Sequence, residues 1–329
     1  MTALVETRDL TVRFTGERVV HALNGVDLTL DQGEVLGLIG ESGSGKSVTL
    51  KALLRMLPPR RAQISGSIRV AGRDVMALSP AELVDLRGGI VSMIFQEPML
   101  ALDPVYTIGD QIAETVVRHA GVSWAEGRRR ALEMLEHVRI PSARRRIDSY
   151  PHEMSGGMRQ RDHGALALSC RPKVLLADEP TTALDATVQI QILLLLRELQ
   201  RELGMAVIFV THDIGVAVEI CDRVAVMYAG RVVETGELRA VIKEPAHPYT
   251  RGLLAATVLG ARRGTRLETI AGAPPRLDRL PKGCAFAPRC RLADAACGLG
   301  EVPMTVLAAG HSARCLKLAA EPLTQVARA

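Results

Sequence analysis

The residues most able to do chemistry lie between Gly40 and Ser47, a segment that reads GESGSGKS. It fits the pattern GxxxxGK(S/T), in which glycines let backbone N–H groups curl around phosphates. An apolar run precedes the segment and a helical pattern follows it, so the helix start adds the positive end of its dipole. We expect Lys46 to reach the β- and γ-phosphates of a nucleotide and the Ser47 hydroxyl to bind Mg²⁺. The candidate nucleotide contacts are Gly40, Ser42, Gly43, Ser44, Gly45, Lys46, Ser47 and Val48.

Two adjacent acids provide a second candidate group. The apolar run 174–177 ends in Asp178 and Glu179, as expected for a buried strand that carries acids at its carboxyl end. We expect Asp178 to hold Mg²⁺ through its water shell, and Glu179 to orient or deprotonate the attacking water. Two such acids could instead cap a helix, but the phosphate loop upstream favours the catalytic interpretation.

A second anion site is predicted at Ser155-Gly156-Gly157. The pattern predicts a helix that begins at Gly156 with Ser155 as its N-cap. Helix starts attract anions, so this is a second phosphate-binding element in the same chain. A phosphate loop and a separate helix start in one chain suggest that two chains enclose nucleotide between them.

Four of the six cysteines crowd into the last 46 residues, at Cys284, Cys290, Cys297 and Cys315. Four thiolates can hold zinc or an iron–sulfur cluster. The intervals of 5, 6 and 17 residues lack the tight pairs of structural zinc sites, and four buried thiols without metal remain the plain alternative. Prolines are frequent here, so we expect a metal to order residues 283–316. Because these cysteines lie far in sequence from the phosphate loop, we expect Cys→Ser changes to disturb assembly more than ATP chemistry.

The order of patterns predicts how these residues are positioned. Apolar and alternating runs between turn signals predict strands at 5–14, 25–30, 35–39, 173–178, 206–211, 223–229 and 231–234, with helices at 47–57 and 188–203. Strands alternating with helices predict an α/β fold with a parallel sheet. We expect a nucleotide-binding domain over 1–258, with a helical subdomain inserted at about 97–170, and a cysteine-containing extension over 259–329.

Composition excludes several classes of protein. Nine aromatic residues in 329 are too few for the stacking platforms of single-stranded nucleic-acid binders. An excess of five basic residues fits an anionic ligand or a membrane surface without requiring DNA. The apolar stretches are too short to span a membrane, and charges at Glu6, Arg8 and Asp9 argue against a signal peptide. We therefore expect a cytoplasmic protein whose membrane role, if any, comes through partners.

Over about residues 4–255 the chain resembles the ATP-binding subunits of ABC transporters. Six elements match in order: the phosphate loop, Gln96 in FQEP, Ser155-Gly156-Gly157, Asp178-Glu179, Ala183-Leu184-Asp185, and His212 in THD. The resemblance implies that Gln96 senses Mg²⁺ and water and couples to the membrane subunit. It also implies that Asp185 lies in the loop linking the two nucleotide sites and that His212 contacts the γ-phosphate. The nucleotide-stacking aromatic of the family should precede Gly25, where Phe14 is the only aromatic in the expected loop region.

The closer resemblance is to the oligopeptide/dipeptide/nickel importer branch. It rests on FQEPMLALDP at 95–104, ADEPTTALD at 177–185, HPYTRGLL at 247–254 and the tail from GCAFAPRC at 283–290 onward. The branch implies a [4Fe–4S] cluster on Cys284, Cys290, Cys297 and Cys315, with zinc as the alternative. It implies ATP and Mg²⁺ as cofactors and peptides as substrate.

The branch also implies a set of partners. They are a second, related ATPase subunit that forms a heterodimer, two transmembrane permease subunits and an extracytoplasmic solute-binding protein, without nucleic acid. The expected location is the cytoplasmic face of the inner membrane, as a peripheral subunit. The alternatives are an importer subunit for nickel or another small solute, an exporter subunit, and a soluble ABC ATPase acting on nucleic acid or the ribosome.

One stretch departs from the family. Arg161-Asp162-His163-Gly164 occupies a helix in which relatives look apolar. Glycine in a helix interior costs about 1 kcal/mol relative to alanine. A carboxylate at Asp162 is tolerable only if it is exposed or paired, for example with an arginine. We expect this stretch to weaken the helical subdomain without affecting the nucleotide chemistry.

Overall fold

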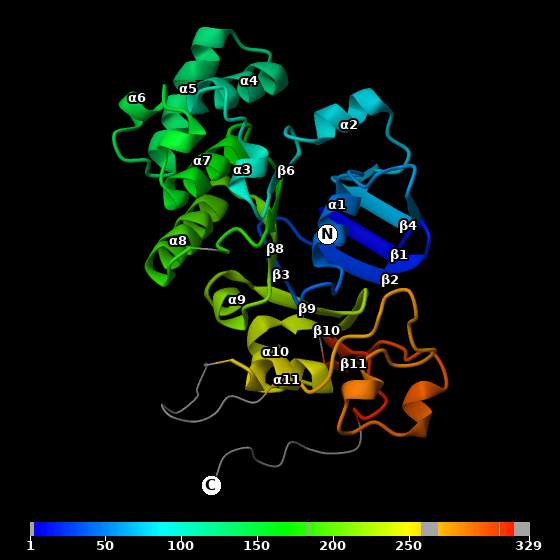
Figure 1. Ribbon diagram of the computed structural model, residues 1–329. Helices are drawn as coiled ribbons and strands as arrows, with labels where there is room; N and C mark the ends of the chain where they lie inside the picture. The colour runs from blue at the N-terminus through cyan, green and yellow to red at the C-terminus, as the bar shows by residue number, and fades with distance from the viewer. Residues whose placement is uncertain (1–2, 183, 258–268, 309, 319–329) are drawn as a thin grey trace.

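A computed structural model of the chain describes residues 3–182, 184–257, 269–308 and 310–318. Two β-sheets stand beside a lobe of helices, and the C-terminal tail lies against the opposite end of the sheets (Figure 1). Ala183 and the expected domain boundary at 258/259 lie outside the described residues. Within those residues, no helix combines the length and hydropathy needed to cross a bilayer.

The larger sheet carries the chemistry. Its strand order is β11-β12-β10-β9-β3-β8-β7-β6, and the five strands from β9 to β6 run parallel. Parallel strands place all their carboxyl ends at one edge, where the α/β fold builds its ligand sites. The bounds are β3 Val35–Ile39, β6 Val91–Ile94, β7 Val174–Asp178, β8 Ala206–Thr211, β9 Arg223–Tyr228, β10 Arg231–Glu237, β11 Thr305–Ala308 and β12 His311–Ala313.

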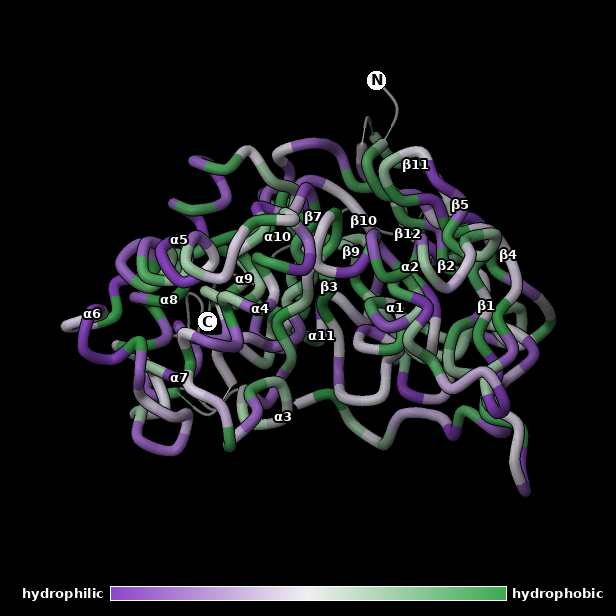
Figure 2. Tube along the Cα trace, turned by 90° about the horizontal axis from the view of Figure 1, so that it is seen from above, coloured by the Kyte–Doolittle hydropathy of each residue, from purple (hydrophilic) through white to green (hydrophobic). Residues whose placement is uncertain are grey.

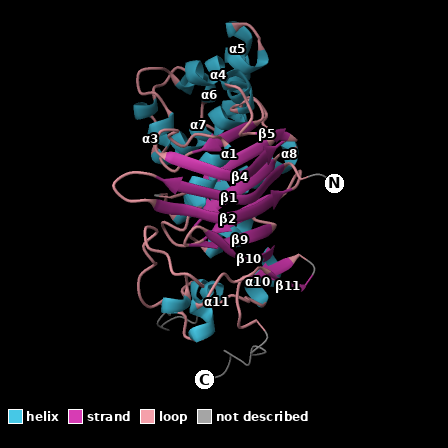
Figure 3. Ribbon diagram, turned by 90° about the vertical axis from the view of Figure 1, so that its right-hand side faces the viewer, coloured by secondary structure: helices cyan, strands magenta, loops and turns pink. Residues whose placement is uncertain are grey.

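The smaller sheet is antiparallel, with the order β2-β1-β4-β5, and its strands lie side by side in Figure 3. Its bounds are β1 Val5–Phe14, β2 Val20–Leu30, β4 Ala62–Val70 and β5 Arg73–Asp74. Helix α1, Lys46–Leu53, packs Leu50 and Leu53 into the core that the two sheets share. The helix ends four residues earlier than the expected 57, and Arg55 then adopts a φ of 48°.

A lobe of helices lies between β6 and β7 in chain order. It comprises α3 Pro98–Ala101, α4 Ile108–Ala120, α5 Trp124–His137, α6 Ala143–Arg146 and α7 Gly156–Leu168. Side-chain oxygens of Thr107, Ser123 and Ser155 cap α4, α5 and α7. The remaining helices are α2 Pro80–Leu86, α8 Ala186–Leu203, α9 Ile214–Ile220, α10 Leu238–Lys243 and α11 Pro248–Ala255. Hydrophobic and hydrophilic residues alternate along the helices (Figure 2), and buried hydrophobic residues of α4, α5, α7 and α8 join those of the larger sheet in one core cluster.

The C-terminal tail packs against the main domain through a strand pair and buried side chains. Strand β12 pairs with β10, so the tail extends the larger sheet. Phe286 packs against the rings of Tyr228 and Tyr249, with centroids 5.3 and 5.4 Å away. Buried His311 contacts the buried carboxylate of Glu234 at 2.8 Å. Contacts with the main domain therefore hold this proline-rich segment in place, in addition to any metal that its cysteines bind.

The interior of α7 differs from expectation. Asp162 is completely buried, and both of its carboxylate oxygens lack a hydrogen-bond partner among the described residues. Burial raises its pKa to about 7, although the charge of Arg146 acts in the opposite direction. Asp162 therefore meets neither condition for a tolerable carboxylate, because it is not exposed and has no hydrogen-bond partner within the described chain. A side chain on Gly164 would meet nothing within 4 Å, so packing does not require glycine there.

His163 is buried beside Asp162. Its ring stacks on Phe95 at 5.9 Å, its Nε2 accepts from the Phe95 N–H at 3.5 Å, and Nδ1 lacks a partner within the described chain. Burial lowers the pKa of His163 to about 4. This helix therefore places two ionisable side chains in an apolar environment that disfavours the charge of each.

Candidate functional site

The phosphate loop follows β3 and depends on its glycines. Gly40 has a φ of 156°, and a Cβ there would lie 2.2 Å from the Met227 carbonyl oxygen. Gly45, the N-cap of α1, has a φ of 107°, and its Cβ would lie 2.8 Å from Leu23. Side chains are therefore excluded at both positions. The loop can wrap closely around a ligand at the start of the helix.

Lys46 lies inside this loop. Its ammonium donates to the carbonyl oxygens of Gly40 and Glu41 at 2.7 and 3.0 Å, and the residue is 5% exposed. Burial lowers its pKa, whereas the acids Glu179, Asp178 and Glu41 favour the charged form. The positive charge is thus held in the loop by groups that a phosphate could replace.

An oxygen pair lies beside the loop. The Ser47 hydroxyl donates to Asp178 Oδ1 at 2.9 Å, which joins the first turn of α1 to the end of β7. Burial raises the pKa of Asp178, and the hydrogen bond from Ser47 opposes that shift. Oxygen donors of this kind suit Mg²⁺, which keeps several waters when it binds one or two protein groups.

Glu179 is the centre of a small cluster at the same edge. Its φ of 46° turns the chain sharply after β7, and its side chain is 16% exposed. One carboxylate oxygen, Oε2, accepts from Gln96 Nε2 at 3.4 Å and lies 3.2 Å from His212 Nδ1. The structure thus brings together the three residues expected to be catalytic, each from the end of a different strand.

Thr182 is a member of this cluster that the sequence analysis missed. Its hydroxyl donates to Glu179 Oε2 at 2.9 Å. The only available signal was its position three residues after Glu179, a spacing at which a turn returns a side chain to the acid. The same turn is closed by the backbone bond from Thr182 N–H to the Glu179 carbonyl at 3.2 Å.

The second phosphate element lies apart from the first. Ser155 caps α7 by accepting from Met158 N–H at 3.4 Å, and both Ser155 and Gly156 are exposed. Gly157 faces Val188 in the first turn of α8, whose N-cap is Asp185. These residues belong to the lobe side of the molecule, whereas the phosphate loop leads into α1 on the other side of the larger sheet (Figure 1).

The four tail cysteines line one small cavity together with His247 and Phe286. All four are free thiols. Burial raises the pKa of Cys315, and the nearby thiols Cys284, Cys290 and Cys297 raise it further. Within the described ranges, however, no group of three or more His, Cys, Asp or Glu side chains has the arrangement of a metal-ion site.

The tail also reaches the phosphate loop, although the two lie far apart in sequence; the effect of Cys→Ser changes stays a prediction. Arg289, next to Cys290, forms an ion pair with Glu41 of the loop at 2.6 Å. Separation in sequence therefore does not keep the cysteine segment away from the ATP chemistry. The hydrogen bonds that Arg289 donates to Glu41 and to Tyr228 raise the pKa of its guanidinium, which favours the charged form of the arginine.

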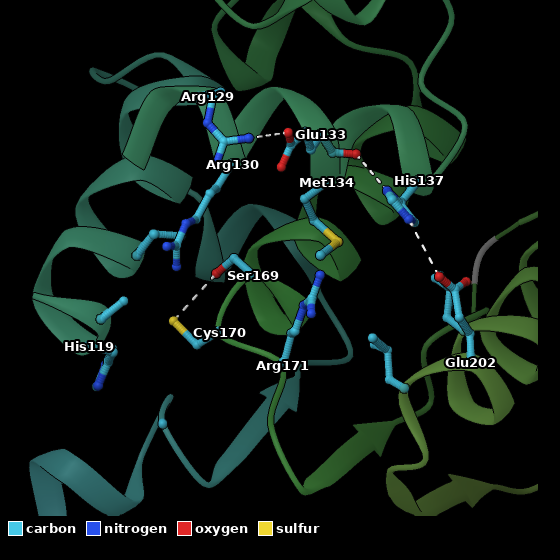
Figure 4. A pocket seen from close by; sticks show the side chains of 15 residues that line it. His119, Arg129, Arg130, Glu133, Met134, His137, Ser169, Cys170, Arg171 and Glu202 are labelled. Carbon is cyan, nitrogen blue, oxygen red and sulfur yellow. Dashed lines mark hydrogen bonds and ion pairs between the residues drawn. The ribbon is translucent and has the colours of Figure 1, made fainter. Parts of the chain in front are cut away.

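Another cavity, of about 460 Å³, lies at the amino ends of β6 and β7, away from this site (Figure 4). Its charged lining groups largely pair with one another. Arg129 pairs with Glu133, and His137 lies 3.6 Å from Glu202. The cavity contains none of the residues expected to bind nucleotide or metal.

Comparison with known proteins agrees with this geometry. Residues 23–182 match the ABC transporter family, and residues 233–297 match the oligopeptide/dipeptide transporter C-terminal region. Relatives from Brucella melitensis biotype 1 and Brucella abortus, both named as peptide import ATP-binding proteins, are 49% identical. These matches cover 93% and 95% of this chain and 94% of each relative.

Solved structures show the same fold. The dimeric ATP-binding cassette MJ0796, bound to ADP and Pi, is 31% identical with a TM-score of 0.64, covering 71% of this chain and 99% of that one. The protein cbiO1 of Clostridium perfringens, described as part of the ABC transporter complex cbiONQ, is 30% identical with the same TM-score, covering 74% of this chain and 92% of that one. The chain belongs to the ABC transporter family, and it carries the C-terminal region of the oligopeptide/dipeptide transporters.

Proposed function

We propose that this chain is the ATP-hydrolysing subunit of an ABC importer for peptides. The observation that carries the proposal is the meeting of Lys46, Ser47, Asp178 and Glu179 at one edge of the parallel sheet. The relatives named for peptide import, and the matching C-terminal region, support the transported class.

The proposed chemistry assigns each residue one role. Lys46 and the backbone N–H groups from Gly43 to Val48 bind phosphates, and Ser47 with Asp178 holds Mg²⁺. Glu179 activates water for attack on the γ-phosphate, with His212 beside it. The 3.4 Å contact from Gln96 to Glu179 supports a role for Gln96 in positioning that water or the metal.

We propose that the second half of each nucleotide site comes from another ATPase chain. The exposed Ser155-Gly156 helix start leaves its N–H groups available to phosphate, and the Asp185 loop lies near it through the Gly157–Val188 contact. ATP binding would close the pair of ATPase chains, and hydrolysis would reopen it.

The further partners are two permease subunits and an extracytoplasmic solute-binding protein, with the chain on the cytoplasmic face of the membrane. The branch resemblance favours a related, distinct ATPase as partner.

We propose that the extension, from about residue 259, holds a metal group on Cys284, Cys290, Cys297 and Cys315. The shared cavity, and the rise that Cys284, Cys290 and Cys297 cause in the pKa of Cys315, support a site formed by all four. A [4Fe–4S] cluster is favoured over zinc because the sequence intervals lack tight cysteine pairs. Such a group would tie the tail segments together.

The metal proposal is tested by anaerobic purification of the full chain. A cluster predicts a brown protein with broad absorption near roughly 400 nm and about four irons per chain. One zinc in a colourless preparation would replace the cluster with a zinc site. Neither metal, with a tail still protected from protease, would reject both.

The transport proposal is tested by identifying the membrane partners. Pull-down of the full chain should recover two permease subunits and a second ATPase, and the reconstituted assembly should hydrolyse ATP faster with peptide-loaded binding protein. Stimulation by nickel but not by peptide would change the substrate class. Recovery of ribosomes or nucleic acid without permeases would reject the importer.

A further inference from the structure

Arg289 makes an unusually complete set of contacts for a tail residue. Its two terminal nitrogens bond the two carboxylate oxygens of Glu41, at 2.6 and 3.0 Å. The guanidinium also donates to the Tyr228 hydroxyl at 3.2 Å and to the backbone oxygens of Ile270 and Ala271. Its side chain is 4% exposed. A bidentate pair of this kind, with its arginine buried and its carboxylate partly exposed, fixes geometry as well as charge.

Glu41 is the second residue of the phosphate loop, and it is held at several points. Its N–H donates to the Tyr249 hydroxyl at 2.8 Å, and its carboxylate accepts from Arg289. Its carbonyl oxygen accepts from the Lys46 ammonium at 3.0 Å and from Ser44 N–H at 3.2 Å. Contacts therefore run without interruption from the tail, through Glu41, to the lysine that faces phosphate.

A closely packed group of three aromatic rings lies next to the Arg289–Glu41 ion pair. The rings of Tyr228 and Tyr249 lie 4.6 Å apart, and Phe286 packs against both. The Arg289 guanidinium lies 5.8 and 5.9 Å from the Tyr228 and Phe286 ring centroids. The guanidinium thus has little freedom to leave the carboxylate, since aromatic faces and backbone oxygens hold its other sides.

We propose that Arg289 is a positioning residue for the phosphate loop, which sets nucleotide affinity by neutralising and orienting Glu41. The inference rests on the proposed nucleotide site. An unpaired Glu41 carboxylate would place a negative charge in the loop that receives the triphosphate. Its backbone, which holds Lys46, would also lose an anchor. Both effects weaken binding, the first by repulsion and the second by lost preorganisation.

A second ion pair between tail and domain provides a matched control. Glu301 of the tail pairs with Arg231 of β10 at 2.5 Å, and its side chain is 66% exposed. Glu301→Gln therefore breaks a tail contact that does not include a phosphate-loop side chain. If the tail only stabilised the fold, breaking either ion pair would change nucleotide affinity by a similar amount.

The experiment measures the affinity of the purified full chain for a fluorescent ATP analogue with Mg²⁺. We expect Arg289→Ala to weaken binding about tenfold and Glu301→Gln to leave it unchanged. In Arg289→Ala/Glu41→Gln the repelling carboxylate is gone, so affinity should return to within about threefold of wild type. The loss in the single variant should shrink as salt is raised.

Several results would overturn the proposal. They are wild-type affinity in Arg289→Ala, an equal loss in Glu301→Gln, or a double variant as weak as the single one. If Arg289→Ala does not fold, Arg289→Gln replaces it in the same cycle and must show the same rescue. Loss of binding in Lys46→Ala, with wild-type affinity in the Arg289 variants, would reject this inference while leaving the nucleotide site intact. No binding by the wild type would reject the site itself.

Discussion

The strand-end cluster, defined here as Lys46, Ser47, Asp178, Glu179 and His212, contrasts with helix α7. Both bury ionisable side chains. In the cluster, each buried charge has a partner: Lys46 has two carbonyl oxygens and Asp178 has the Ser47 hydroxyl. In α7, the Asp162 carboxylate has no hydrogen-bond partner among the described residues, and His163 keeps one free nitrogen.

The difference shows which buried ionisable groups of this chain are hydrogen-bonded and which are not. A buried charge with hydrogen-bonded partners is a prepared ligand site, whereas one without partners tends to become neutral. The two regions also differ at their helix starts, because α1 opens between buried Ser44 and Lys46, whereas α7 opens at exposed Ser155 and Gly156. The proposed phosphate loop is thus largely enclosed within the chain, whereas the start of α7 is exposed.

The largest expected effect comes from removing the base of the cluster. Glu179→Gln keeps the shape of the side chain but cannot take a proton, so ATP turnover by the assembled transporter should fall by about 10²–10⁴. ATP binding should be retained, because Lys46, Ser47 and Asp178 are unchanged. Glu198→Gln, at an exposed ion pair with Arg139, is the control. Turnover near the wild-type rate would show that Glu179 is not the base.

The next effect is on binding itself. Lys46→Ala removes the charge aimed at the phosphates, and nucleotide affinity should fall about 100-fold, as expected for the loss of two charge-assisted hydrogen bonds. Titration of the purified chain with a fluorescent ATP analogue measures this. Lys51→Ala, on an exposed position of the same helix, should bind as the wild type does. Equal affinity in Lys46→Ala would remove Lys46 from the site.

Ser155→Ala sharpens the contrast between the two helix starts. It should lower ATPase activity of the assembled transporter about tenfold, while the isolated chain binds nucleotide normally. Loss of the cap should also cost about 1 kcal/mol of stability. Ser123→Ala removes the equivalent cap from α5 and so isolates that stability term. If Ser123→Ala lowers activity as much, the effect of Ser155 is only structural.

The smallest effect concerns the pH dependence of folding stability, set by α7. Burial raises the pKa of Asp162 from 3.8 to about 7, so the folded state binds more protons and stability falls as pH rises through that window. Burial lowers the pKa of His163 from 6.5 to about 4, so its contribution has the opposite sign between about 4 and 6.5. In the wild type the two slopes should nearly cancel across the shared window.

Substitution separates these slopes. In Asp162→Asn, stability should rise by about 1 kcal/mol per pH unit between pH 4 and 6.5, and in His163→Gln it should fall by a similar amount. Urea unfolding at several pH values measures both. Identical pH profiles in the two variants would show that neither side chain is buried in its neutral form.

Sequence alone determined most of the nucleotide chemistry. The phosphate loop, the acid pair after 174–177 and the Ser155 cap depend on local rules, in which a glycine, a strand end or a cap specifies nearby backbone. The parallel sheet then had to bring Gln96, Glu179 and His212 to one edge, because parallel strands end on the same side. The family resemblance added roles that spacing could not.

Only the tertiary structure decided how distant segments meet. Nothing local in the sequence indicates that Asp162 faces the interior or that Arg289 reaches Glu41. Arg289 and Glu41 are 248 residues apart, and they meet because β12 joins the larger sheet and Phe286 packs on Tyr228 and Tyr249. Such a contact depends on the packing of whole elements, so no local pattern in either segment could predict it.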